Sequence, residues 1–186
     1  MRSSRAPMVV LAVLLPVFAA LVQPAELVER VLAVVDGRVL CLSDVRAVEH
    51  VDGVARDVAL ARLVDETLLF HEASRLPQSA VSGDDPEGAE AARVGDDPAV
   101  RRALYRRAVI RKYVAFRFRP QVRVDEEAVR KLYAEDVVRG NPPAFEDAAP
   151  AIRERLAAQE VERRVADWVR DLRLAAVIRY NPVEPD

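Results

Sequence analysis

The first apolar pattern along the chain predicts a β-hairpin. Two short runs of apolar and β-branched residues, 31–35 and 39–42, are separated by Asp36-Gly37. Asp-Gly between such runs is a strong hairpin signal, because both turn positions need a positive φ. A similar run at 176–180 is stopped by Pro182 and predicts a further strand. Because a lone hairpin is marginally stable in water, we expect this strand to pair with it, joining the two ends of the chain in a small antiparallel sheet.

Helical periodicity follows the hairpin. Ser43 is the predicted N-cap of a first helix, with Asp44 in its first turn, and Gly53 interrupts that helix. A second helix is predicted from Val54 to Arg75. Residues 26–76 are therefore expected to hold the hairpin and the first helices of the domain. Apolar positions of the second helix recur at spacings of three and four and predict one buried stripe: Leu60, Leu63, Val64, Leu68 and His71.

The pattern changes completely at residues 77–97. This stretch, PQSAVSGDDPEGAEAARVGDD, is rich in Pro, Gly, Ser and acidic residues. It has too little apolar surface to compensate for the entropy lost on ordering. We therefore predict a flexible acidic linker between two helical blocks.

Residues 98–186 are predicted to complete the same domain with further helices and the terminal strand. Asp97 and Pro98 form an N-cap and first-position pair that starts a long helix. Acidic residues 125–127 open a short helix, and the last helix is predicted to begin near Pro150. The fold class is therefore mostly α with a small antiparallel sheet. Inward-facing positions are expected at Val129, Leu132 and Tyr133, and at Ile152, Leu156, Val161, Val165, Trp168, Val169 and Leu172.

Residues 1–25 have the pattern of a secretory signal peptide. Arg2 and Arg5 precede the uncharged apolar run 8–22, and small residues follow at the spacing that a signal peptidase reads. Cleavage would release a periplasmic protein. The alternative is an uncleaved anchor in the inner membrane facing the periplasm, because roughly 20 apolar residues span a bilayer. Both alternatives place the folded part outside the cytoplasm.

Composition and motifs exclude several classes of protein. The 186 residues carry 28 Lys+Arg, 30 Asp+Glu and 51% hydrophobic residues, which is typical of a folded, helix-rich chain. The single cysteine, Cys41, allows neither an internal disulfide nor a multi-cysteine metal site, and no histidine pattern supports it as a nucleophile. His71-Glu72 begins like the zinc motif H-E-x-x-H, but Arg75 stands where the second histidine is needed, and His50 has no ligand spacing to His71. We therefore expect no catalytic residue, no cofactor and no metal ligand.

Several segments resemble the SurA-like family of periplasmic chaperones and parvulin-type foldases. ERVLAVVDGRVLCLSDVR followed by ALARLVDETLLFHEASRL resembles the opening hairpin and leucine-rich helix of that family. AFRFRPQVRVDEEAVRKLYAED is similar to its acidic-capped helix, and AIRERLAAQEVERRVADWVRDLRLAAVIRY to its closing helix and strand. The resemblance covers residues 29–76 and 104–180. It implies a SurA-like helical chaperone core that binds unfolded or newly translocated polypeptides, such as outer-membrane proteins.

The chain departs from this family where its members usually carry a prolyl isomerase domain. Such a domain needs roughly 90 to 100 residues, an ordinary small-domain size. Only residues 135–149 lie at the corresponding place, too few for any domain. The resemblance therefore implies no isomerase activity and no enzyme. The competing hypothesis is a structural or envelope-assembly subunit derived from a parvulin-type isomerase, with envelope assembly proteins as its partners.

The strongest charge feature is the arginine-rich segment 101–123, which contains no acidic residue. Basic residues interleaved with aromatic ones are also found in nucleic-acid surfaces, but export and an acidic mature chain argue against that partner. We expect a solvated helix face neutralised within the molecule by the acidic linker and by residues 125–127. The aromatic residues of this segment are candidate client-binding residues, with one of the two phenylalanines expected to be exposed: Tyr113, Phe116 and Phe118.

Overall fold

A computed structural model describes residues 29–82, 85, 97–140 and 143–181 of the chain. Within these ranges the protein is mostly helical, with a small three-stranded antiparallel sheet formed by an N-terminal hairpin and a C-terminal strand. The predicted fold class is therefore confirmed. The predicted signal peptide at 1–25 lies outside the described residues, and none of the described helices is both long and apolar enough to cross a membrane.

The sheet joins the two ends of the described chain, as predicted. Its strands are β1 (Val31–Val35), β2 (Arg38–Cys41) and β3 (Ile178–Tyr180), in the order β2-β1-β3. The turn residues Asp36 and Gly37 have φ values of 47° and 81°, which confirms the predicted turn. The Asp36 carboxylate also accepts a hydrogen bond from the Val177 N–H at 2.8 Å, so the turn itself holds the start of the C-terminal strand.

Helix α1 (Leu42–Asp52) starts two residues earlier than expected. Cys41, not Ser43, is the N-cap residue, and it makes no side-chain capping bond. The prediction was wrong because a carboxylate from outside the helix caps its first turn: the Ser43 N–H donates to Glu29 Oε1 at 3.0 Å. Gly53 ends the helix as predicted, with φ of 63° in the left-handed region.

Helix α2 (Arg56–Ala73) packs against both the sheet and α1. Leu63, Val64 and Leu68 of the predicted stripe are buried, Leu60 packs against their cluster, and His71 is half-buried. Burial extends further around the helix than one stripe, because the sheet and three other helices contact α2. The main core cluster is Leu32, Ala33, Val35, Leu40, Val45, Val48, Ala59, Leu63, Val64 and Leu68.

The first part of the predicted flexible linker is packed structure. Residues Pro77–Ser79 form the 3₁₀ turn η1, and the buried Ser79 hydroxyl donates to the carbonyl oxygens of Ala73 and Leu76. Lys112 donates to the Ala80 carbonyl oxygen at 2.7 Å. The prediction of flexibility is therefore wrong for residues 77–82, because these polar groups find partners on neighbouring helices. Residues 83–84 and 86–96 lie outside the described residues.

Two predicted helix starts are confirmed in the second half. Helix α4 (Pro98–Arg117) is capped by Asp97, whose carboxylate accepts from the Ala99 N–H at 2.7 Å, and the turn η2 (Arg119–Gln121) follows it. Helix α5 (Glu126–Arg139) is capped by Asp125, which accepts from the Glu127 N–H at 3.2 Å. Val129 is fully buried between α5 and the next helix, as expected.

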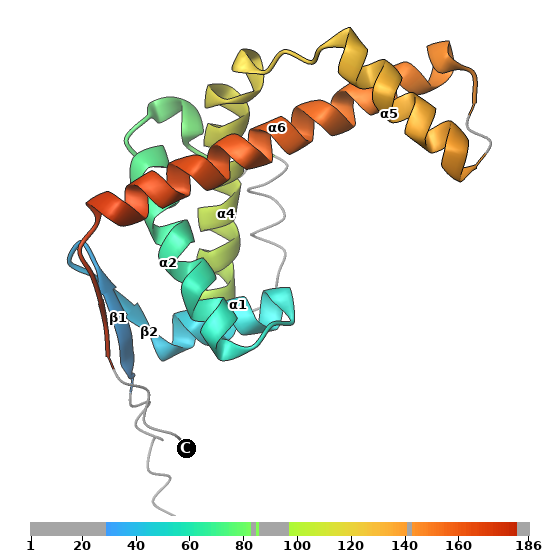
Figure 1. Ribbon diagram of the computed structural model, residues 1–186. Coiled ribbons are helices and arrows are strands. Elements are labelled where there is room, and N and C mark those ends of the chain that lie inside the picture. The colour runs from blue at the N-terminus through green and yellow to red at the C-terminus, as the bar shows by residue number, and fades with distance from the viewer. Residues whose placement is uncertain (1–28, 83–84, 86–96, 141–142, 182–186) are drawn as a thin grey trace, which may run out of the picture.

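The last helix, α6 (Phe145–Ala175), begins five residues before the predicted start, so Pro150 lies inside it. Proline there removes a helical hydrogen bond. Packing against α5 offsets that loss: Phe145 meets Tyr133 edge to face at 5.2 Å between ring centroids, and Ala149 and Ile152 are buried. Figure 1 shows α6 running from α5 across α4 and α2 to the strand that returns to the sheet.

Candidate functional site

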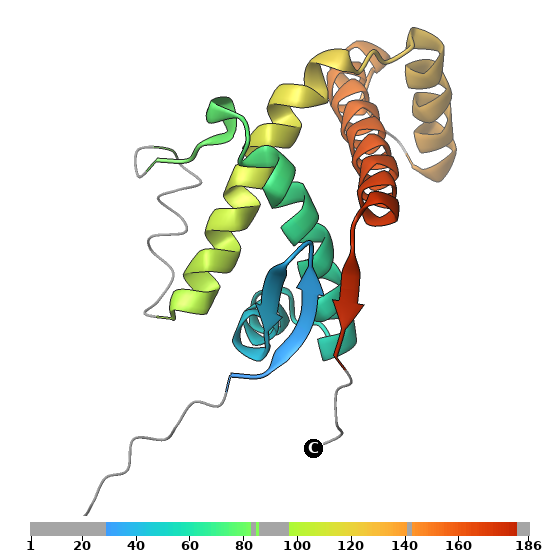
Figure 2. The same ribbon diagram turned by 90° about the vertical axis from the view of Figure 1, so that its left-hand side faces the viewer.

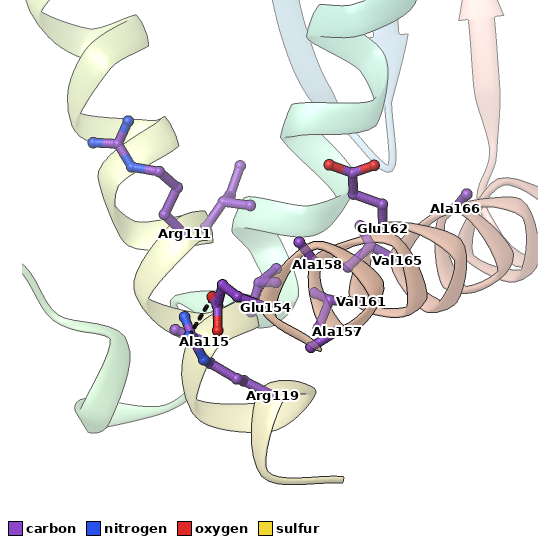
Figure 3. Close-up of a pocket in the computed structure, with 12 residues that line it drawn as sticks. Arg111, Ala115, Arg119, Glu154, Ala157, Ala158, Val161, Glu162, Val165 and Ala166 are labelled. Carbon is purple, nitrogen blue, oxygen red and sulfur yellow. Dashed lines mark hydrogen bonds and ion pairs between the residues drawn. The ribbon is translucent and has the colours of Figure 1, made fainter. Parts of the chain in front are cut away.

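An apolar groove lies between α4 and α6. It has a volume of about 520 Å³, and Figure 3 shows Arg111, Ala115 and Arg119 on one wall and the α6 side chains on the other. Four charged side chains also line it: Arg111, Arg119, Glu154 and Glu162. The apolar lining residues are Ile110, Val114, Ala115, Ala157, Ala158, Val161, Val165 and Ala166.

The spacing of these residues explains why a groove forms here. Ile110 and Val114 are one helical turn apart on α4, and Val161 and Val165 are one turn apart on α6, so each helix offers one short apolar strip. Alanines fill much of the remaining lining and are too small to close the space between the helices. The four larger side chains are all only half-buried, so the groove exposes aliphatic surface to water.

Opposite charges stand on the two walls of the groove. Arg111 belongs to α4 and Arg119 to the turn η2 that follows it, whereas Glu154 and Glu162 belong to α6. Arg119 Nη2 lies 2.5 Å from Glu154 Oε1, with the two side chains 63% and 62% exposed. An ion pair this exposed contributes at most about 1 kcal/mol, so it marks one end of the groove without locking it.

The aromatic residues predicted to bind clients are divided between two environments. Tyr113 is 6% exposed and stacks on Trp168, with ring centroids 5.3 Å apart. Phe118 is half-buried, 5.5 Å from the same indole ring. Phe116 is 54% exposed, which confirms that one phenylalanine is exposed, but it does not line the groove. Tyr113 and Phe118 therefore anchor α6 to α4, and neither offers a free ring to a client in this structure.

Replacing Trp168 by alanine should loosen this anchor. The side chain is half-buried and contacts two aromatic rings, so we expect a loss of about 2 kcal/mol in the free energy of unfolding, below the roughly 3–5 kcal/mol of a fully buried tryptophan. Urea denaturation measures it. Trp168→Phe keeps a ring between the helices and should lose no more than half as much free energy of unfolding as Trp168→Ala. Equal losses in the two variants would contradict the stacking argument.

Within the described residues, some arginines of α4 pair with acids other than those predicted. Arg102 pairs with Asp44 at 3.0 Å, and Arg107 bridges Glu66 and Asp52, each at 2.6 Å. These acids come from α1 and α2, because α4 packs against both helices. Lys112 does pair with Asp85 of the predicted linker, whereas Glu126 of the 125–127 cluster pairs with Arg153 of α6. The arginine-rich face is thus largely an intramolecular ion-pair surface.

Other candidate chemistry stays isolated in the described part of the chain. No group of three or more His, Cys, Asp or Glu side chains there could hold a metal ion. Cys41 is half-buried at the end of β2, and burial, followed by the charges of Glu29 and Asp44, raises the pKa of its thiol. A raised pKa favours the unreactive thiol over the nucleophilic thiolate.

The residues that line the groove were not identified from the sequence as a site. Val161 and Val165 were predicted to face inward, and their half-buried state is compatible with that pattern. Periodicity cannot separate an aliphatic residue of a core from one beside a groove, since both occupy the same helix face. Comparisons with protein-family models, with curated proteins and with solved structures found no match to this chain.

Proposed function

We propose that the protein is a chaperone-like polypeptide-binding protein without isomerase activity. It holds apolar stretches of unfolded or newly translocated polypeptides, including outer-membrane proteins, in the groove between α4 and α6. The single observation that carries this proposal is that groove: about 520 Å³ of open space with a mainly aliphatic lining.

The character of the groove favours weak, unselective binding. Aliphatic surface gains free energy from burial by any apolar side chain, roughly 25 cal/mol per Å², and imposes little geometry. The described residues that line the groove include no His, Cys or Ser, and of its two carboxylates Glu154 is paired with Arg119. The opposite charges on the two walls can attract client segments of either charge and help to keep the protein soluble.

The resemblance to SurA-like chaperones supports the same proposal. The sequence pattern of residues 1–25 supports export, and the periplasm is where an outer-membrane client is unfolded. The connection between α5 and α6 is too short for the isomerase domain of that family. We therefore propose a periplasmic protein, or one anchored in the inner membrane and facing the periplasm, that binds clients and catalyses nothing.

Filling the groove should weaken client binding. Ala158→Arg places a long charged side chain in the apolar lining, and because Ala158 is exposed the fold should persist. We expect the variant to bind a denatured outer-membrane protein at least about tenfold more weakly and to lose suppression of its aggregation, measured by light scattering at stoichiometric amounts.

A matched substitution on the same helix controls for the added charge. Ala175→Arg changes another exposed alanine of α6 that does not line the groove, and it should leave suppression unchanged. Equal activity of both variants would place client binding elsewhere. Prolyl isomerisation faster than the uncatalysed rate would contradict the absence of enzyme activity.

A second candidate function is that of an envelope-assembly subunit. Helix α5 and the first half of α6 form a projecting pair with its own small core, seen at the upper end of the molecule in Figure 1. A projecting arm is suited to contact a stable protein partner. Failure of the wild-type protein to suppress aggregation, together with a stable complex isolated from the cell envelope, would favour this function.

A further inference from the structure

Each outer strand of the small sheet, β2 and β3, has an unpaired edge within the described structure. β2 is an outer strand of the order β2-β1-β3, and Figure 2 shows it on the side of the sheet that faces α4, with β3 at the opposite edge. Leu40 pairs with Ala33 of β1, and the Leu42 N–H donates to the Arg30 carbonyl oxygen at 2.8 Å. Because backbone groups alternate in direction along a strand, the N–H groups of Val39 and Cys41 point away from β1.

A second pocket, of about 370 Å³, lies beside this edge and extends to α2 and α4. Arg38, Val39 and Leu40 of β2 line one side. The aromatic rings of Phe70 and Tyr105 form part of its wall, in edge-to-face contact at 6.4 Å between centroids. Val39 is 52% exposed and Tyr105 is 44% exposed, so the strand edge and an aromatic surface are both open to a ligand.

The pocket carries an excess of positive charge. Arg38, Arg102 and Arg106 line it, and Asp44, which pairs with Arg102, is the one carboxylate in its lining. Arg38 Nη2 donates to His71 Nδ1 at 2.6 Å. Arg106 shares Glu66 with Arg107, and its buried Nη2 has no hydrogen-bond partner among the described residues.

We propose that β2 and this pocket bind an extended polypeptide segment that carries an acidic side chain. The segment pairs with β2 as a fourth strand, through the outward backbone groups of Val39 and Cys41. Alternate side chains of an added strand point to the face of the sheet that covers the pocket. An acidic side chain there meets the guanidinium groups, and an apolar side chain two residues away, on the same face, packs on Phe70 and Tyr105. This site is separate from the groove between α4 and α6 and goes beyond the function proposed for it.

Short peptides test the proposal on the purified full chain. The probe is a fluorescent, end-capped Val-Thr-Glu-Thr-Val peptide, in which both valines share a strand face with the glutamate. Its binding is followed by fluorescence anisotropy. Replacing its glutamate by glutamine should weaken binding at least about tenfold, because the charge-assisted hydrogen bonds are lost. Methylating its backbone nitrogens should weaken binding to a similar extent, because strand pairing needs those donors. Hydrogen exchange at the Val39 and Cys41 amides should slow only in the complex.

Variants of the protein separate the two parts of the site. Arg102→Gln should weaken binding of the glutamate peptide and reduce its advantage over the glutamine peptide. Arg170→Gln, which changes a similarly exposed, singly paired arginine of α6, should leave both affinities unchanged. Val39→Pro removes an N–H that β1 does not use, so it should preserve the fold and prevent strand addition.

Each of four results would overturn the proposal. The first is no binding of the glutamate peptide up to millimolar concentration, and the second is equal affinity for the glutamate and glutamine peptides. The third is undiminished binding of the backbone-methylated peptide, which is decisive even if Val39→Pro does not fold. The fourth is loss of peptide binding in Ala158→Arg, because the peptide would then occupy the groove and not the strand edge.

Discussion

Replacing Leu63 by alanine is expected to lower the free energy of unfolding by about 3–4 kcal/mol, the largest effect of any single substitution considered for this protein. Leu63 is 0% exposed and lies in the main core cluster, where α2 meets both the sheet and α1. Its truncation leaves a cavity that the paired strands on one side and the helix on the other cannot easily fill. Urea denaturation followed by circular dichroism measures the loss.

Leu174→Ala is the matched control for this experiment. It removes the same atoms from a helix, but the Leu174 side chain is 81% exposed, so the free energy of unfolding should change by no more than about 0.5 kcal/mol. A loss below about 1 kcal/mol for Leu63→Ala would mean that the core between sheet and helices is not packed as described.

Features set by neighbouring residues could be predicted from the sequence. The Asp36-Gly37 turn, the Asp97 and Asp125 caps and the end of α1 at Gly53 all follow from the conformational preferences of one or two residues. The terminal strand was predicted from composition and from the instability of a lone hairpin, and it pairs with β1.

Predictions failed where a distant residue decided the local structure. Ser43 has the side chain of an N-cap, but Glu29 reaches its N–H from before the hairpin. Pro150 has the backbone of a helix start, but packing of α5 against α6 extends the helix beyond it. Tyr113 looked available because its helix is rich in arginine, yet it stacks on Trp168, which is far away in the sequence. In each case the competing contact is tertiary and leaves no signal in the local pattern.

Helix α4 connects the two proposed binding sites. Ile110 and Val114 line the groove, Arg102 and Arg106 line the pocket beside β2, and Tyr113 holds α6. The sequence pattern of α4 suggested one basic surface, but its residues face different neighbours along and around the helix. Only the contacts of α4 with α1, α2 and α6 show which of its arginines form ion pairs and which line a binding site.

Replacing Asp52 by alanine is expected to cost about 3 kcal/mol at neutral pH. The Asp52 carboxylate accepts from both terminal nitrogens of Arg107, at 2.6 and 2.9 Å, and from Arg62 at 2.7 Å. Only 12% of the Asp52 side chain and 21% of the Arg107 side chain are exposed, so the variant leaves a partly buried guanidinium with Glu66 alone. Removing one partner of a buried pair typically costs about 3–5 kcal/mol, and the residual exposure favours the lower end.

The pH dependence of this loss distinguishes an ion pair from simple packing. The hydrogen bonds from Arg107, ahead of the smaller contribution from Arg62, lower the pKa of Asp52 below its ordinary value. A carboxylate whose pKa is lowered by folding stabilises the protein fully above its unfolded pKa, about 3.9. It loses that contribution as the pH falls through the lower, folded value. The difference in the free energy of unfolding between the wild-type protein and Asp52→Ala should therefore be constant between about pH 5 and pH 8. It should shrink below about pH 4.

Asp44→Ala provides the comparison within the same helix. Asp44 makes a single 3.0 Å bond to Arg102, whose side chain is 57% exposed, so its loss should cost no more than about 1 kcal/mol. Urea denaturation of both variants at several pH values measures the two effects side by side. Equal losses, or a loss in Asp52→Ala that persists unchanged at pH 3, would show that charge pairing with Arg107 is not what joins α1 to α4.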